Sequence, residues 1–187
     1  MSRKPKTPTS TPLPLSSLNA MPVAEARELC GGFFENSPWI VEEALKERPF
    51  ESLHDFHAVC MRVIDAAGVA RQLELIRAHP DLVGRLAREG RLGQESTQEQ
   101  AAAGLTQLTE KEIKAFERYN AAYHDRFGFP FVICARRNRK EAILAALPQR
   151  LEQTRTEEIR TALAEIGDIA LLRMLDAVRE ETEKEKQ

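Results

Sequence analysis

The spacing of hydrophobic residues predicts helices along most of the chain. These residues recur at intervals of three and four, which places them on one face of an α-helix. In 52–66 the hydrophobic stripe consists of Leu53, Phe56, His57, Cys60 and Ile64. In 110–127 it consists of Ile113, Phe116, Asn120, Tyr123 and Phe127. Weaker patterns predict further helices at about 22–34, 38–47, 69–78, 97–103, 139–152 and 155–182.

Local signals at the helix ends support this interpretation. Thr109 precedes the run 110–127 and Glu112 follows three residues later, which is the pattern of a capping box. Gly128 follows the run where a C-terminal cap is expected. The only strand-like run, 129–134, cannot form a sheet alone, so we expect an extended connector. The predicted fold class is therefore all-α, a single compact bundle of about seven to nine helices.

The two ends of the chain differ from its middle. Residues 1–17 are rich in Pro, Ser, Thr and Lys and lack the apolar stretch of a signal peptide, so we expect a disordered tail. Residues 18–178 form the predicted helical domain, and 179–187 a charged C-terminal tail. The length of 187 residues suits one domain. No stretch is apolar for long enough to span a bilayer, so no membrane partner is expected.

Composition removes several function classes. The formal net charge of −2 argues against a general nucleic-acid binder, and the basic run 136–140 is predicted to be a solvated loop, with a phosphate or nucleic-acid patch as the weaker alternative. Cys30, Cys60 and Cys134 are odd in number and widely spaced, which favours free thiols in a reducing cytoplasm. The sequence contains no Cys or His spacing typical of a metal site and no nucleotide-binding glycine motif, so neither a metal nor a nucleotide cofactor is expected.

Two polar segments carry candidate chemistry. His79 stands before Pro80, and a residue before proline avoids helical backbone, so we expect His79 where a helix ends. Its imidazole there serves either acid–base chemistry in a cleft or an interaction with the helix dipole. Ser96 and Glu99 have the Ser-x-x-Glu spacing of a capping box, and the capped helix N-terminus is also suited to binding an anion. Structural and functional interpretations remain open at both places.

A charged residue interrupts the hydrophobic face of the C-terminal helix. Arg173 lies within the apolar run 169–175 and on the same stripe as Ile166. Because a guanidinium stays charged, its burial requires an anionic partner, either an internal carboxylate or one from a substrate, unless the side chain reaches the surface. The aromatic run 127–133 predicts a pocket wall with available backbone groups, or simple core filling.

Taken in order, four segments of the chain resemble the 2-oxo-4-hydroxy-4-carboxy-5-ureidoimidazoline (OHCU) decarboxylase family of the urate-to-allantoin pathway. They are His79-Pro-Asp-Leu-Val-Gly84, Ser96-Thr-Gln-Glu-Gln100 with Ala103-Gly-Leu105, Phe127-Gly-Phe-Pro-Phe-Val-Ile133, and Ile169-Ala-Leu-Leu-Arg-Met174. The opening Leu18-Asn-Ala-Met21 also resembles the start of the family. The similarity covers about 18–178, which is the whole predicted domain.

This resemblance implies a cofactor-free decarboxylase that releases (S)-allantoin and carbon dioxide from a small anionic ureidoimidazoline. By motif match, His79 is the catalytic histidine and Glu99 the essential carboxylate. The implied substrate-binding residues are Pro80, Ser96, Gln100, Arg173, and Phe131 and Ile133, the last two through their backbone. Members of the family are often dimeric, so a homodimer is an expectation here.

The implied substrate supplies its own electron sink, because its carboxylate and hydroxyl share one ring carbon beside a C=N bond. We expect His79 and Glu99 to act as a pair on the hydroxyl and the proton transfer, and Arg173 with the helix N-terminus at Ser96 to hold polar groups. A carboxylate near His79 is expected to favour its protonated form. The alternatives are a helical enzyme acting on a related ureido acid and a non-catalytic binding module.

Overall fold

The computed structural model describes residues 11–84 and 94–181, and within them the chain is mainly helical, as the all-α prediction requires. The described residues contain nine α-helices, two short 3-10 helices and two strands of two residues. In chain order these are β1 Leu13–Pro14, α1 Leu15–Ala20, α2 Val23–Cys30, α3 Trp39–Ala44, η1 Leu45–Glu47, α4 Leu53–Ala66, α5 Gly68–Arg77, α7 Gln94–Ala102, α8 Glu110–Phe127, η2 Ala135–Arg137, α9 Lys140–Leu151, α10 Arg155–Ala177 and β2 Val178–Arg179.

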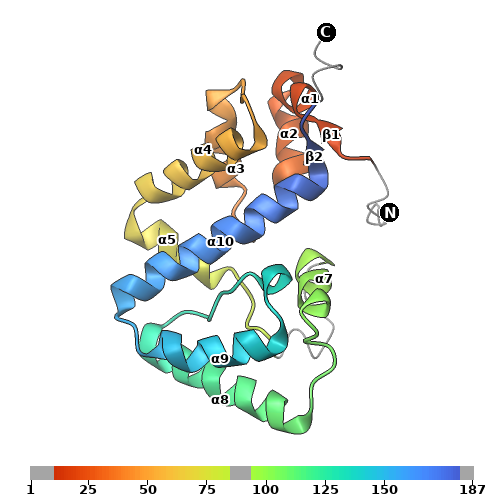
Figure 1. Ribbon diagram of the computed structural model, residues 1–187. Helices are drawn as coiled ribbons and strands as arrows, with labels where there is room; N and C mark the ends of the chain where they lie inside the picture. The colour runs from red at the N-terminus through yellow and green to blue at the C-terminus, as the bar shows by residue number, and fades with distance from the viewer. Residues whose placement is uncertain (1–10, 85–93, 182–187) are drawn as a thin grey trace, which may run out of the picture.

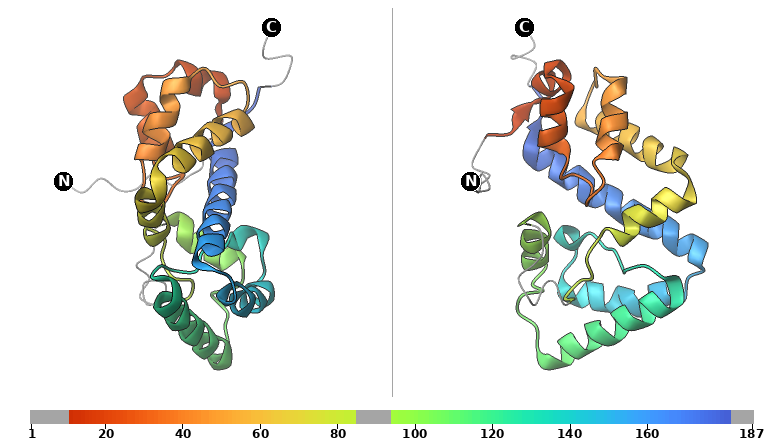
Figure 2. Two further views of the ribbon diagram at one scale, coloured as in Figure 1. Left: turned by 90° about the vertical axis from the view of Figure 1, so that its left-hand side faces the viewer. Right: turned by 180° about the vertical axis from the view of Figure 1, so that it is seen from behind.

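The long helix α10 organises the molecule. It crosses the middle of Figure 1, with α1–α5 on one side and α7–α9 on the other. The two further views in Figure 2 show the same division. Helices α2, α4 and α5 pack against α10, and α8 packs against α9.

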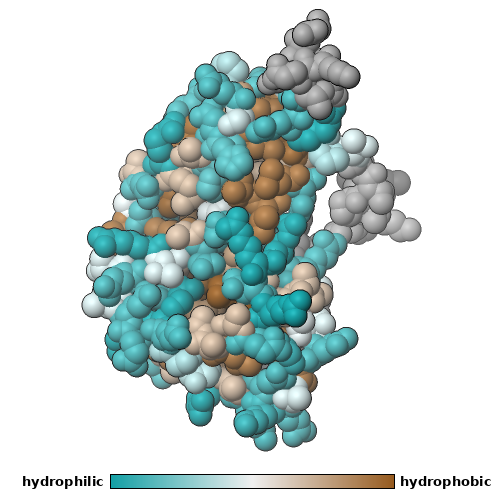
Figure 3. All heavy atoms as spheres, viewed as in Figure 1, coloured by the Kyte–Doolittle hydropathy of each residue, from teal (hydrophilic) through white to brown (hydrophobic). Residues whose placement is uncertain are grey.

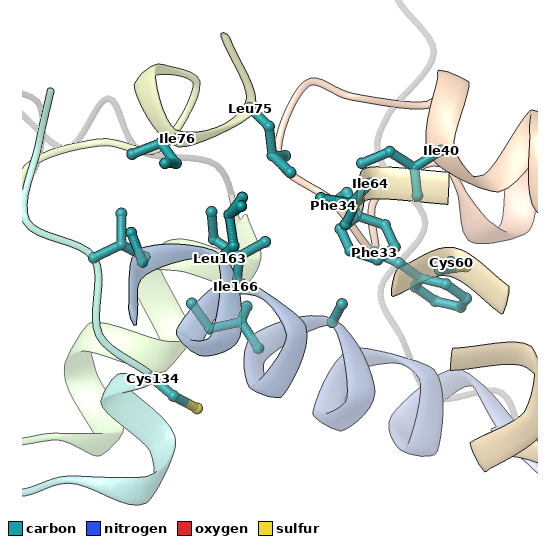
Figure 4. Close-up of a cluster of buried hydrophobic side chains, with 14 of the residues drawn as sticks. Phe33, Phe34, Ile40, Cys60, Ile64, Leu75, Ile76, Cys134, Leu163 and Ile166 are labelled. Atoms are coloured by element: carbon teal, nitrogen blue, oxygen red, sulfur yellow. The ribbon is translucent and has the colours of Figure 1, made fainter. Parts of the chain in front are cut away.

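The core lies along α10. Figure 4 shows Leu163 and Ile166 of α10 beneath Leu75 and Ile76 of α5, with Cys134 reaching α10 from the connector that follows α8. Further along α10, Phe33, Phe34, Ile40, Cys60 and Ile64 fill the space between α10 and the N-terminal helices. Burial of such apolar side chains is the dominant favourable term in folding.

Helices α4 and α10 approach each other closely at Gly167. A Cβ atom at Gly167 would lie 3.0 Å from Sδ of Met61, so a larger residue there would require the end of the Met61 side chain to shift. At the same place Nε2 of His57 donates a hydrogen bond to the Gly167 carbonyl oxygen, at 2.9 Å. This half-buried histidine on the predicted α4 stripe therefore has a structural partner.

The predicted ends of α8 are confirmed. The hydroxyl of Thr109 accepts from the Glu112 N–H at 3.3 Å, and the Glu112 carboxylate accepts from the Thr109 N–H at 2.7 Å, so the capping box is complete. Gly128 ends the helix with φ 75°, a left-handed conformation that glycine adopts without a Cβ penalty. Residues 130–134 then continue without regular secondary structure, which confirms the predicted connector.

Two predictions about the chain ends were wrong. Residues 13–14 pair in parallel with 178–179, and α1 follows with Leu15 and Leu18 buried, so residues 13–17 are not part of a disordered tail. The C-terminal helix ends at Ala177, earlier than the predicted 182. A strand of two residues is too short to show alternating hydrophobic and polar positions, and each of these strands pairs with a strand far away in the sequence. The sequence pattern therefore does not reveal this pair. Residues 1–10 and 182–187 lie outside the described part.

The loop after α2 is also longer than predicted. The helix expected over 22–34 ends at Cys30.

No helix in the described ranges is long and apolar enough to cross a membrane.

Candidate active site

His79 lies just beyond the end of α5, as its position before Pro80 predicts. Its backbone N–H still bonds the Ile76 carbonyl at 3.2 Å, but the next residue leaves the helix. The side chain is buried, and Nδ1 lies 2.9 Å from the carbonyl oxygen of Leu75. Because a carbonyl oxygen only accepts, Nδ1 carries the hydrogen. In the neutral ring, Nε2 therefore keeps a lone pair that can accept a proton.

The environment of His79 keeps its ring neutral. Burial lowers the pKa of His79 to about 4. The hydrogen bond to Leu75 acts in the opposite direction, the charge of Arg173 adds to the lowering, and the charge of Glu99 raises the pKa. Glu99 favours the protonated form of His79, as expected from a nearby carboxylate, but removal of the ring from water outweighs this effect and leaves the pKa low.

Arg173 is buried and forms a two-pronged ion pair with Glu99. Its Nε and Nη2 donate to the two carboxylate oxygens of Glu99, each at 2.8 Å. Its Nη1 donates to the Gly32 carbonyl at 3.0 Å and to the Glu35 carboxylate at 3.3 Å. Burial alone would lower the pKa of Arg173, but its hydrogen bond to Glu99 and the charges of Glu99 and Glu35 raise it. The sequence left three possibilities for Arg173, namely an internal carboxylate, a substrate carboxylate or a surface position. The structure places the internal carboxylates of Glu99 and Glu35 against it.

The capping-box interpretation of Ser96 and Glu99 was wrong. Helix α7 begins at Gln94, so Ser96 lies within its first turn and not at its cap. Both oxygens of Glu99 bond Arg173, on a helix far away in the sequence, where a capping box would bond the N-cap backbone. The side chain of Ser96 lies outside the described residues.

The segment that follows His79 is held by polar side chains of α7 and α8. The Gln100 side-chain oxygen accepts from the Val83 N–H at 3.2 Å, and Asn120 donates to the Leu82 carbonyl at 2.9 Å. The Asp81 carboxylate meets Nε2 of His124 at 2.8 Å. Val83 has φ 55°, which is rare for a β-branched residue and persists only where neighbouring bonds hold it. Gln100 therefore couples α7 to the strained turn beside His79.

These segments surround one pocket against α10. Its polar lining residues are His79, Glu99, Gln100 and Arg173. Its apolar lining residues are Pro80, Leu82, Val132, Ile133, Ala135 and Ile169. A few convergent polar groups in an otherwise apolar pocket are typical of a small-molecule site.

A buried network fixes the connector that forms the apolar wall. Arg150 donates from Nη1 to the Val132 carbonyl at 2.6 Å and pairs with the fully buried Glu158. Its guanidinium also lies 4.5 Å from the ring centre of Phe131, which packs edge-on against Tyr123 at 5.3 Å. The Phe131 ring thus belongs to the core behind the pocket, while the next residues line it.

Comparison with known proteins identifies the family. A family model described as OHCU decarboxylase matches residues 19–175. The chain belongs to the OHCU decarboxylase family. It is 39% identical over 165 residues to the 2-oxo-4-hydroxy-4-carboxy-5-ureidoimidazoline decarboxylase of Amia calva, which covers 88% of this chain and 94% of that protein. The enzyme of the same name from Haloferax volcanii is 36% identical over 164 residues, covering 88% and 95%.

A solved structure supports the same fold. The crystal structure of (S)-allantoin synthase matches with a TM-score of 0.73 at 28% sequence identity and covers 90% of this chain. The match covers 54% of that protein, so this chain spans about half of its length.

The residues implied by the OHCU decarboxylase motifs mostly meet in the pocket. It is lined by His79, Pro80, Glu99, Gln100, Ile133 and Arg173, whereas Phe131 does not line it. No separate signal in the sequence points to Leu82, Val132, Ala135 and Ile169, although each lies in or beside a matching motif. Glu35 was missed altogether, because it meets Arg173 across 138 residues of sequence.

The described residues contain no group of three or more His, Cys, Asp or Glu side chains placed to hold a metal ion. Cys30, Cys60 and Cys134 are free and buried. Burial raises the pKa of the Cys30 thiol to about 12, which keeps it protonated and unreactive.

Proposed function

We propose that this chain is an OHCU decarboxylase, which converts 2-oxo-4-hydroxy-4-carboxy-5-ureidoimidazoline to (S)-allantoin and carbon dioxide in urate degradation. Two relatives that this chain matches over most of their length are named as this enzyme. The observation that carries the proposal is a pocket in which a neutral His79 lies with the Glu99–Arg173 ion pair, within a chain that matches the family along 19–175.

The chemistry of the substrate suits such a pocket. When carbon dioxide leaves, the electron pair of the broken C–C bond forms a C=C bond to the neighbouring ring carbon. The former C=N pair moves to nitrogen, which takes up a proton. The hydroxyl then loses its proton to become the carbonyl of allantoin, and the neighbouring carbon gains one. The protein has to orient the substrate and deliver that last proton to one face.

His79 is suited to move these protons. Its Nδ1 is held by Leu75, so the free lone pair of Nε2 is available to accept the hydroxyl proton. A histidine whose pKa lies near 4 is neutral at neutral pH and, once protonated, is a strong enough acid to pass the proton on to carbon. The carboxylate of Glu99 favours the transient imidazolium electrostatically. These roles of His79 and Glu99 are part of the proposal.

The remaining lining residues position the substrate in this proposal. Arg173 holds Glu99 in one orientation through two hydrogen bonds and contributes the positive side of the pocket. Pro80, Gln100 and the backbone at Ile133 contact the ureido and ring groups. Ser96 and Phe131 remain proposed substrate contacts by motif match alone.

We also propose a cytoplasmic homodimer. The three free, buried cysteines suit a reducing compartment. Figure 3 shows hydrophobic residues gathered over α2 and the C-terminal part of α10, where Val23, Leu29 and Leu175 are exposed. An exposed apolar patch of this kind is typical of a protein interface. Light scattering after size-exclusion chromatography should give twice the chain mass of 21.1 kDa, and a mass of one chain would contradict the dimer.

The function is tested with freshly made substrate. Urate is oxidised and hydrolysed by added enzymes in a circular dichroism cuvette, with and without this protein. We expect the protein to accelerate the appearance of the (S)-allantoin signal and to suppress the racemic product of the spontaneous reaction. Equal rates and no net ellipticity in both cuvettes would contradict the proposed function.

A further inference from the structure

The basic run 136–140 does not form an open patch of positive charge. Arg137 pairs with Asp168 at 2.6 Å, and Lys140 pairs with Glu112 at 2.9 Å. Arg136 donates to both carboxylate oxygens of Asp176, at 2.5 and 3.1 Å. These acidic partners neutralise three of the cations and disfavour a nucleic-acid surface. Arg136 also lines a cavity.

This second cavity adjoins the pocket that contains His79. Its volume is about 250 Å³, and its lining residues are Gln98, Glu99, Ala102, Arg136, Arg173 and Asp176. Glu99 and Arg173 line both cavities, so the two meet at this ion pair. Along η2, Ala135 faces the inner pocket while Arg136 faces this outer cavity.

The charges around the inner pocket do not favour an anion. Arg173 is the only arginine or lysine among its described lining residues. All three nitrogens of its guanidinium already donate to Glu99, Glu35 or the Gly32 carbonyl. Two carboxylates against one guanidinium leave this cluster with a formal charge of −1, and His79 is neutral. A substrate with a carboxylate therefore needs a further cation.

Arg136 is the cation best placed to supply that charge. Its partner Asp176 has 61% of its side chain exposed, and the Arg136 side chain is 31% exposed. Ion pairs so close to water contribute little stability, so another carboxylate can replace Asp176 at small cost. A guanidinium fork matches the two oxygens of a carboxylate well. The charge of Glu99 contributes to raising the pKa of Arg136, so the two groups lie within electrostatic range of each other.

On the basis of the proposed function, we propose that the outer cavity is the anion-binding part of the active site and that Arg136 binds the substrate carboxylate there in place of Asp176. The ligand class is a small ureide that bears a carboxylate. Carbon dioxide and allantoin both lack that carboxylate, so the products are not retained by Arg136.

Steady-state kinetics separate this role from a structural one. Arg136→Gln should raise KM at least tenfold and leave kcat within twofold, and Arg136→Lys should restore part of the loss. Asp176→Asn breaks the same ion pair but leaves Arg136 available, so its KM should not rise. A purely structural ion pair predicts the same change for Arg136→Gln and Asp176→Asn, and that result would overturn the proposal. Arg137→Gln breaks a comparable surface pair with Asp168 and is the matched control.

A binding measurement makes the test independent of turnover. Isothermal titration calorimetry uses two stable probes, diureidoacetate, which is a ureide with a carboxylate, and allantoin, which has none. Wild-type protein should bind diureidoacetate at least tenfold more tightly than Arg136→Gln, with equal affinities for allantoin. Absence of diureidoacetate binding to wild-type protein, or equal weakening for both probes, would overturn the role of Arg136. Failure of wild-type protein to convert OHCU would instead contradict the proposed function.

Discussion

Replacing Arg173 by methionine removes the charge that neutralises Glu99 and keeps much of the side-chain volume. Arg173 and Glu99 have only 7% and 12% of their side chains exposed. Removing one partner of a buried ion pair costs about 3–5 kcal/mol, because the other charge stays buried without compensation. For a domain of this size, that loss corresponds to a melting temperature roughly 6–20 °C lower. Thermal unfolding followed by far-UV circular dichroism measures this shift.

A double variant identifies the cause of the loss. Glu99→Gln together with Arg173→Met removes both charges, so it should recover part of the stability that Arg173→Met alone loses at pH 7. An Arg173→Met variant as stable as wild type, or a double variant no more stable than Arg173→Met, would refute the reasoning.

Three further predictions concern other parts of the structure. The imidazole of His79 should titrate near pH 4 in NMR spectra, and titration near pH 6.5 would contradict the described burial. Because the unfolded state takes up this proton at higher pH than the folded state, the free energy of unfolding should fall by about 3 kcal/mol between pH 6.5 and pH 4. Arg150→Met leaves the fully buried Glu158 without its partner, so urea denaturation should show a loss of about 3–5 kcal/mol, and an unchanged midpoint would refute this. Thr154→Ala removes the hydroxyl that caps α10 and should cost about 1 kcal/mol in the same assay, with Thr161→Ala, which lies inside the helix, as a comparison.

The features that were predictable from the sequence depend on neighbouring residues. The stripes of α4 and α8, the capping box at Thr109 and the glycine cap at Gly128 are all set within one or two helical turns. The end of α5 just before His79 follows from the nearby Pro80. Such local rules also gave the all-α class and the extended connector after α8.

The features that were missed depend on distant contacts or on burial. The strand pair joins residues 13–14 to 178–179, and Glu35 reaches Arg173 across 138 positions. The Ser-x-x-Glu spacing at Ser96 is compatible with a cap, but the buried Arg173 holds Glu99 more strongly than a helix N-terminus would. The pKa of His79 is lowered because the folded chain excludes water from its ring, which no local pattern reveals.

The most direct test of the central claim is the handedness and rate of allantoin formation by a His79→Asn variant. The asparagine amide can still donate to the Leu75 carbonyl, but it has no basic nitrogen in place of Nε2. If far-UV circular dichroism and the melting temperature show a folded protein, we predict that the accelerated, enantioselective formation of (S)-allantoin is lost. A folded His79→Asn variant that forms (S)-allantoin at near-wild-type rate would contradict proton transfer by His79.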